Sequence, residues 1–185
     1  MSIRPPEYAI ILIGFRACGK TTLGRRLAAD LRRPFFDLDL EIELAHGRSI
    51  LRMFEQEGEA WFRQVEAEML SGVLKLGRMV LAPGGGAVLL ERNRSLLKTA
   101  GLVIYLRVPE SDLLARLDRQ GQRPRLTHRS LEDEVRELLK DRAPLYEQVA
   151  ARIVDSTLAE NEDQTYSKLF RVVQEGGGSP SDALP

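Results

Sequence analysis

The sequence predicts an α/β fold in three layers, in which a five-stranded parallel sheet is flanked by helices on both faces. Five short, almost continuous apolar runs occur along the chain, and a stretch with helical periodicity separates each run from the next. Parallel strands are buried on both faces and need crossover helices, so this alternation is typical of them. Ligands of such sheets bind at the carboxyl ends of the strands, where we expect the chemically active residues.

The predicted elements follow from local signals in chain order. The first helix ends before Pro34, which cannot continue it, and Gly47 and Gly58 interrupt the helical stretches after the second strand. From 59 to 76, apolar residues recur at spacings of three and four, which makes one helix face apolar. Ser130 begins a capping-box pattern. Strands are expected at 8–13, 35–36, 79–82, 102–106 and 152–155, and helices at 21–32, 41–44, 50–54, 59–76, 91–99, 109–117, 130–146 and 164–174.

The chain has 185 residues, a length that suits one domain with a sizeable core. We expect residues 1–175 to form this domain. Residues 176–185 are mostly Gly, Ser and Pro with little apolar content, so a flexible tail is expected there.

Between the first strand and the first helix, the residues from Gly14 to Thr21 match the phosphate-loop pattern G-x-x-x-x-G-K-[ST]. Gly14 and Gly19 let the backbone bend around a phosphate, and the helix N-terminus adds partial positive charge. Lys20 would bridge the outer phosphates, and the Thr21 hydroxyl would bind Mg²⁺. A chance glycine-rich turn is the alternative. The strand before the motif and the helix after it favour a nucleotide-binding domain of the P-loop NTPase type.

Acidic residues follow two of the predicted strands, where a phosphate loop usually finds a partner that helps to hold Mg²⁺. Asp37 follows the second strand and Asp155 ends the fifth. Asp37 and Asp39, at i and i+2 of an extended strand end, would lie on the same side, one near the metal and one accepting a proton. Asp155 is the weaker candidate because it stands alone. Turn and cap chemistry would also explain Asp37 and Asp39.

Three consecutive glycines, Gly84, Gly85 and Gly86, follow the third strand. Glycines cost conformational entropy, so three in a row suggest that the backbone approaches a ligand closely, whereas a tight exit turn needs only one or two.

Five arginines crowd residues 116–129, at the end of the helix after the fourth strand and in the segment that follows it. This segment is polar and rich in helix breakers, and we expect a lid at 118–130 that closes over charged phosphates. A solvated charged loop is the alternative, and only one or two of its arginines should contact a ligand. The arginines are Arg116, Arg119, Arg123, Arg125 and Arg129.

Two arginines on predicted helices are candidates for binding a carboxylate. Arg63 and Glu66 are i and i+3 on one helix face, so the Glu66 carboxylate can orient the guanidinium. Arg142 lies on an otherwise amphipathic helix. Two oriented guanidiniums would clamp a substrate carboxylate in bidentate fashion, although each alone is more often a surface ion pair.

Composition limits the classes of partner. Lys+Arg and Asp+Glu both number 27, so no global charge attracts nucleic acid or a membrane surface. No apolar stretch approaches the length of a membrane span, and residues 1–6 contain no signal-peptide core. The single cysteine, Cys18, excludes an internal disulfide and suits a reducing compartment. We therefore expect a cytoplasmic protein that binds neither nucleic acid nor membranes. A monomer is also expected.

Taken together, these motifs resemble the shikimate kinase family over residues 8–169. The phosphate loop alone is shared with many nucleotide-binding proteins, whereas the ordered set is specific. The resemblance implies ATP-dependent phosphorylation of the 3-hydroxyl of shikimate on the route to chorismate and the aromatic amino acids, with Mg²⁺ as cofactor. The set comprises Asp37-Leu38-Asp39, Phe62-Arg63-Gln64-Val65-Glu66, Gly84-Gly85-Gly86, Arg123-Pro124 and Arg142-Ala143-Pro144-Leu145-Tyr146.

The resemblance also implies the role of each site residue. Lys20, Asp39 as the base and Arg123 from the lid would be catalytic. Helices at 39–66 would bind the substrate, and Mg²⁺ would contact Thr21 and, through water, Asp37. ATP would contact Gly14, Ala17, Cys18, Gly19, Lys20, Thr21, Thr22, Arg116 and Arg123. Shikimate would contact Asp39, Arg63, Gly84, Gly85, Gly86 and Arg142.

Two residues depart from the family pattern. Ala17 stands where the family loop usually has Gly, and Pro83 stands where a Thr is common; neither change deletes a side chain with a catalytic role. Cys18 raises a separate hypothesis, because a thiol in an anion-binding loop would react with alkylating agents unless ATP blocks it. A small residue that merely fits the loop is the alternative.

Three other functions compete with this interpretation. A kinase of another small acid, such as gluconate, or a nucleoside monophosphate kinase would use the same loop. A GTP-dependent switch needs an Asp-x-x-Gly element at a strand end and an Asn-Lys-x-Asp base reader. Residues 118–121 match the first element only within the basic segment, and the second is absent.

Overall fold

The computed structural model describes residues 8–119 and 130–176. Within these ranges the chain forms one five-stranded sheet in the order β2-β3-β1-β4-β5, and all the paired strands are parallel. The predicted parallel α/β fold is confirmed. The strands are β1 (Ala9–Ile13), β2 (Phe35–Asp37), β3 (Val80–Ala82), β4 (Gly101–Arg107) and β5 (Arg152–Asp155).

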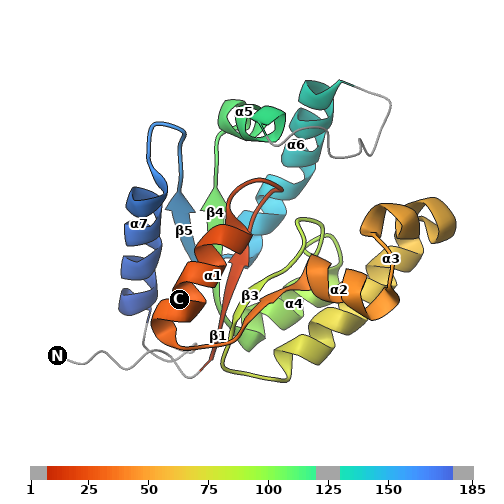
Figure 1. Cartoon of the computed structure of the whole chain (residues 1–185), viewed down its shortest axis with the longest axis horizontal. Coiled ribbons are helices and arrows are strands. Elements are labelled where there is room, and N and C mark those ends of the chain that lie inside the picture. The colour runs from red at the N-terminus through yellow and green to blue at the C-terminus, as the bar shows by residue number, and fades with distance from the viewer. Residues whose placement is uncertain (1–7, 120–129, 177–185) are drawn as a thin grey trace.

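Helices cover both faces of this sheet, which makes the predicted three layers (Figure 1). On one face, α1 and α7 pack against the strands, and on the other face α3 and α4 do so. None of the helices described is long and apolar enough to cross a membrane. The helices are α1 (Lys20–Leu31), α2 (Leu38–His46), α3 (Ile50–Leu74), α4 (Glu91–Ala100), α5 (Glu110–Arg119), α6 (Leu131–Val149) and α7 (Glu162–Glu175).

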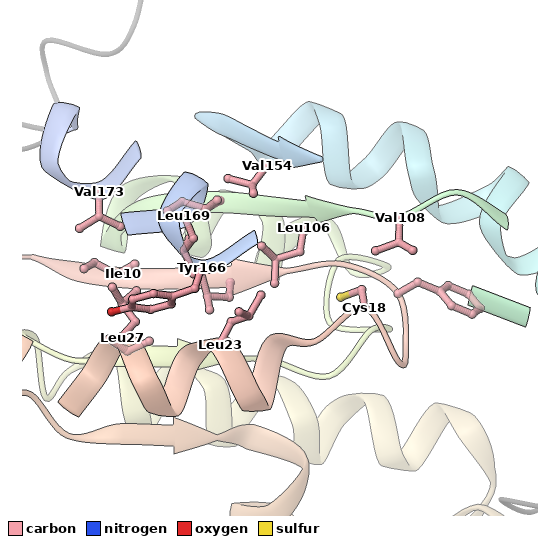
Figure 2. Close-up of a cluster of buried hydrophobic side chains, with 14 of the residues drawn as sticks. Ile10, Cys18, Leu23, Leu27, Leu106, Val108, Val154, Tyr166, Leu169 and Val173 are labelled. Atoms are coloured by element: carbon pink, nitrogen blue, oxygen red, sulfur yellow. The ribbon is translucent and has the colours of Figure 1, made fainter. Parts of the chain in front are cut away.

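Two hydrophobic clusters fill the space between the layers, because successive side chains of a strand point to opposite faces. In β1, Ile10 and Leu12 belong to one cluster, while Ala9, Ile11 and Ile13 belong to the other. Figure 2 shows the first cluster, where side chains of α1 and α7 meet those of β1, β4 and β5. Each fully buried leucine or isoleucine contributes about 1.5–3 kcal/mol, so this double burial holds the phosphate loop after β1 on a rigid base.

Local signals explain where α2 and α3 begin and end. Gly47 ends α2 with φ of +63°, and Ser49 caps α3 by accepting from the Arg52 backbone N–H. Gly58 has φ of +82°, which glycine adopts readily, and it divides α3 into two helical parts as predicted.

Helix α2 begins earlier than predicted and changes the geometry of the aspartate pair. Asp37 ends β2 and caps α2, its Oδ1 accepting from the Leu40 backbone N–H at 3.5 Å, so the helix starts at Leu38. Asp39 therefore lies in the first helical turn. The expectation that both carboxylates project from an extended strand end is wrong, because capping by Asp37 starts the helix between them.

Candidate active site

The phosphate loop bends tightly between β1 and α1. Gly14, Ala17 and Gly19 have φ of +147°, +63° and +100°. A Cβ atom on Gly14 would lie 2.8 Å from both the Cys18 Sγ and the Leu106 carbonyl oxygen, so only glycine fits there. The loop ends at the N-terminus of α1, which orients backbone N–H groups and partial positive charge toward an anion.

Lys20 lies against the inside of this loop. Its Nζ donates to the carbonyl oxygens of Gly14 and Phe15, both at 2.9 Å. Thr22, in the same first turn of α1, is exposed. Both side chains therefore lie at the loop that would hold the phosphates.

Thr21 and Asp37, the residues predicted to serve Mg²⁺, are in direct contact. The Thr21 hydroxyl donates to the Asp37 Oδ2 at 2.6 Å. Among the described residues, no group of three or more His, Cys, Asp or Glu side chains could hold a metal ion. A hydroxyl with a single carboxylate still fits Mg²⁺, which keeps several waters and binds through one or two carboxylates plus substrate phosphates.

The competing candidate, Asp155, is engaged elsewhere. Its two carboxylate oxygens accept from Arg107 Nε at 2.6 Å and Nη2 at 3.0 Å. This fork-shaped pair lowers the pKa of Asp155. The geometry favours Asp37 over Asp155 as the metal residue.

Asp39 lies within the electrostatic influence of Lys20 in the phosphate loop and of Arg63 on α3. Burial raises the pKa of the Asp39 carboxyl above its usual value, the positive charge of Lys20 opposes this, and Asp37 adds to it. A Cβ atom on Gly84 would overlap the Asp39 Oδ1 and would lie 3.0 Å from the Glu66 Oε1. The carboxyl group therefore lies against the backbone of the glycine loop, which comprises Gly84, Gly85 and Gly86.

The three glycines are explained by close approach. A side chain on Gly86 would overlap the guanidinium of Arg63, just as one on Gly84 would overlap Asp39. At Gly85, a Cβ atom would lie 3.4 Å from the Gly14 carbonyl oxygen, which makes this glycine the neighbour of the phosphate loop. The glycine loop thus lies between the phosphate loop and the side chains of Asp39 and Arg63, and its lack of side chains leaves the space between them open.

Arg63 is oriented by two carboxylates. Its Nη1 donates to the Glu66 Oε2 at 2.8 Å, and its Nε and Nη2 donate to the Glu59 Oε1 at 3.1 and 2.9 Å. Only 1% of the Glu66 side chain is exposed. Burial raises the pKa of Glu66, while Arg63 opposes that shift. The predicted orientation of Arg63 by Glu66 is therefore seen in the structure.

Arg142 brings a second guanidinium toward this cluster. Its positive charge acts to lower the pKa of Glu66, and it also acts on Tyr146. Within the described ranges, its Nε is buried without a hydrogen-bond partner, and so is the Glu66 Oε1. Unpaired buried donors are costly, and such a donor suits a ligand that brings acceptor oxygens.

Arg116 of α5 contacts the phosphate loop through backbone carbonyl oxygens of that loop. Its Nη1 lies 3.5 Å and 3.4 Å from the carbonyl oxygens of Ala17 and Cys18, and its Nη2 donates to the Ser156 Oγ at 3.0 Å. Figure 1 shows α5 above the loop that joins β1 to α1. Arg116 thus lies between that loop and the segment after β5.

Cys18 contributes backbone to the loop and its side chain to the core. It is 1% exposed, and Figure 2 shows it among the side chains of the first cluster. The burial favours the view that Cys18 is a small residue that fits the loop, because a buried thiol is poorly accessible to alkylating agents.

Arg123 and most of the predicted lid, 118–130, lie outside the described residues, as does the predicted tail after Gly176. The described residues next to the lid are the end of α5 and Ser130, which caps α6 by accepting from the Asp133 backbone N–H at 3.1 Å.

Sequence reasoning did not assign a role to Tyr146. Its hydroxyl donates to the Gly85 carbonyl oxygen at 2.6 Å, and the ring is fully buried. Burial raises the pKa of Tyr146, so the phenol stays protonated and remains a donor. The tyrosine was present in the motif after Arg142, but nothing in its spacing pointed to a glycine loop 61 residues earlier.

Comparison with known proteins identifies the family of this chain. The family model described as shikimate kinase matches residues 16–174. The shikimate kinase of Bordetella pertussis is 43% identical over 152 residues, which cover 82% of this chain and 72% of that protein. The solved structure of the Acinetobacter baumannii shikimate kinase in complex with shikimate is similar with a TM-score of 0.83 and 39% identity, covering 91% of this chain and 94% of the other. A deoxyadenosine kinase from M. mycoides, with a TM-score of 0.57 and 12% identity over 90% of this chain and 99% of the other, shares the fold alone.

Proposed function

The chain belongs to the shikimate kinase family, and from this premise we propose that the site transfers the γ-phosphate of ATP to the 3-hydroxyl of shikimate, giving shikimate 3-phosphate and ADP. The observation that carries the proposal is the glycine loop. It lies between the phosphate loop on one side and Asp39, Arg63 and Glu66 on the other. A phosphate donor and a small acceptor with hydroxyl and carboxylate groups would meet there.

In the proposed reaction, this chain contributes positioning and charge. Lys20 would leave the loop carbonyl oxygens and bind the phosphates, where its ammonium neutralises developing negative charge. Asp39 would accept the proton of the attacking hydroxyl, since the acceptor hydroxyls would approach its carboxylate beside Gly84. Phosphoryl transfer needs little covalent participation by the protein, so accurate placement supplies most of the rate.

The two arginines would read the carboxylate of the acceptor. Arg63 is held in one orientation by Glu59 and Glu66, and Arg142 has a buried Nε that lacks a partner among the described residues. Planar guanidiniums bind carboxylates in bidentate fashion, which distinguishes a carboxylate-bearing acceptor from a neutral sugar.

Magnesium would be held by Thr21 and, through water, by Asp37, and when bound it would neutralise charge on the phosphates. Removing divalent ions with EDTA should abolish turnover, and added Mg²⁺ should restore it. Full activity in EDTA would contradict this assignment.

Several further assignments rest on the family resemblance. We assign Arg123 and the lid at 118–130 to closure over the phosphates, and Arg116 to the adenine side. Residues 1–175 would act as one kinase domain in the cytoplasm. We also propose that the protein acts as a monomer.

The test is an assay of ADP release with ATP, Mg²⁺ and one acceptor at a time. We expect turnover with shikimate and background rates with gluconate or a nucleoside monophosphate, because neither presents a ring hydroxyl and a carboxylate in the same arrangement. Faster turnover with gluconate would replace the proposed acceptor. No ADP release with any of the three would overturn the proposed function.

A further inference from the structure

An ion pair with a buried carboxylate joins the phosphate loop to α6. The Arg16 Nη2 donates to the Glu134 Oε1 at 2.5 Å, although the two residues are 118 positions apart in the sequence. The Glu134 side chain is 2% exposed and that of Arg16 is 23% exposed. A hydrogen bond between two charged groups is about twice as strong as one between neutral groups, so this contact restrains both side chains. The third residue of the loop is thereby attached to the first turns of α6.

The next residue in the loop has a conformation that its side chain disfavours. Ala17 has φ of +63°, in the left-handed region where the Cβ atom of an L-residue crowds the following carbonyl oxygen. Among the described non-glycine residues, only Ala17 and Arg32 have positive φ, and Arg32 ends a helix. Such residues persist only where surrounding contacts hold them. Ala17 is therefore the strained point of the phosphate loop.

Other contacts hold the loop less firmly at this point. The distances from Arg116 to the Ala17 and Cys18 carbonyl oxygens are 3.5 and 3.4 Å, which are long for hydrogen bonds. Lys20 donates to carbonyl oxygens on the other side of Arg16, and phosphate binding would draw its ammonium away. The Arg16–Glu134 contact is short and charge-assisted, and it does not depend on the position of Lys20.

We infer that the Arg16–Glu134 ion pair holds the phosphate loop in its bent conformation, in which the positive φ of Ala17 is costly. Arg16 and Glu134 are therefore positioning residues for nucleotide binding. The inference rests on the proposed function in one respect, namely that ATP binds at this loop. Neither side chain needs to touch the nucleotide for this role. Without the pair, the loop would relax at Ala17 and its N–H groups would turn away from the phosphates.

The test measures the Kd of Mg²⁺-ADP by calorimetry in four variants and in the wild type. Glu134→Gln keeps the shape of the side chain but removes its charge, and we expect the Kd to rise about tenfold. Glu132→Gln is the matched control, because Glu132 pairs with Arg136 on the exposed side of the same helix, and its Kd should not change. The Kd for shikimate should stay within about twofold in both variants, which separates a loop effect from general loosening.

Ala17→Gly provides the decisive comparison, because glycine adopts positive φ without strain. In that background, adding Glu134→Gln should raise the Kd for ADP by less than about threefold relative to Ala17→Gly alone. An equal rise in both backgrounds would show that the pair does not act on the strain at Ala17. An unchanged Kd in the single variant Glu134→Gln would remove the positioning role altogether.

Two safeguards keep the outcome interpretable. If Glu134→Gln does not fold, the double variant Arg16→Met/Glu134→Met, which removes both charges of the pair, is measured in both backgrounds with the same expectations. Because the readout is ADP affinity, it is independent of the acceptor. A wild type that binds ADP but never phosphorylates shikimate would refute the proposed function and leave this inference testable.

Discussion

Burial and catalysis make opposite demands on the carboxyl group of Asp39. Burial raises its pKa in the folded protein above its usual value, so the folded protein takes up this proton at a higher pH than the unfolded chain does. The ionised group therefore lowers stability at pH values above the folded pKa, and this loss is recovered as the pH falls through that value. The same ionised form is the one that the proposed base requires.

For the variant Asp39→Asn, we expect a fall in kcat of about 10²–10⁴-fold with little change in ATP binding. Its melting temperature at neutral pH should rise, because the buried ionised group is gone. In the wild type, kcat/KM should fall as the pH drops through the raised pKa of Asp39, so its acid limb should lie above the usual value for an aspartate. Turnover at the wild-type rate in Asp39→Asn would exclude this residue as the base.

Arg63 shows how a charge and its geometry can be tested separately. Arg63→Lys keeps the positive charge near Glu66 but loses the planar fork that two carboxylates hold in place. We expect the KM for shikimate to rise about tenfold to a hundredfold while the KM for ATP stays nearly constant. Arg136→Lys, at an exposed ion pair on α6, is the control and should leave both constants unchanged. If the KM for shikimate does not change in Arg63→Lys, the carboxylate clamp is wrong.

Between elements, the glycine loop after β3 determines how closely α2 and α3 approach the phosphate loop. Tyr146 of α6 holds this loop by donating to the Gly85 carbonyl oxygen, and the charged side chains of α2 and α3 lie against its other glycines. A loop with side chains would push these helices outward. The distances of α2 and α3 from the phosphate loop therefore depend on the absence of Cβ atoms in the glycine loop.

Gly86→Ala should disturb this arrangement, because the new methyl group would overlap the guanidinium of Arg63. We expect the KM for shikimate to rise at least about tenfold, with a smaller effect on the KM for ATP. Gly72→Ala is the comparison, since a Cβ atom there meets nothing within 4 Å on α3. That variant should gain about 0.5–1 kcal/mol of stability and keep its kinetics. Equal kinetics in Gly86→Ala and Gly72→Ala would contradict the close approach.

For the whole molecule, the site is assembled at the carboxyl end of the sheet from parts that belong to different layers. Ligands that connect these parts bind the folded chain and not the unfolded one, so they should stabilise it. At about 100 times its Kd, Mg²⁺-ADP should add about 2.7 kcal/mol and raise the melting temperature by about 5–10 °C. Shikimate should also raise it, whereas gluconate should not. Equal shifts with gluconate and shikimate would argue against a specific acceptor site.

The sequence by itself determined the layers of the molecule and the identity of the phosphate loop. Apolar runs such as the one in β1 must be buried on both faces, and this requirement predicts a parallel sheet without any knowledge of distant contacts. The residues from Gly14 to Thr21 are contiguous, so the phosphate-loop motif can be recognised from the sequence alone. The resemblance to a known family extended the prediction of site residues to Asp39, Arg63 and Arg142.

Only the tertiary structure decided which distant residues meet. The helix that contains Asp39 starts at a local cap by Asp37, one of the two explanations that the sequence leaves open, whereas the close approach of Asp39 to Gly84 is a tertiary contact. The ion pair of Arg16 with Glu134 and the bond from Tyr146 to Gly85 join segments 118 and 61 positions apart. Local periodicity predicts which face of an element is buried, but it does not predict which side chain of another element contacts that face. That information exists only once the layers are packed, because packing sets the distances on which hydrogen bonds and ion pairs depend.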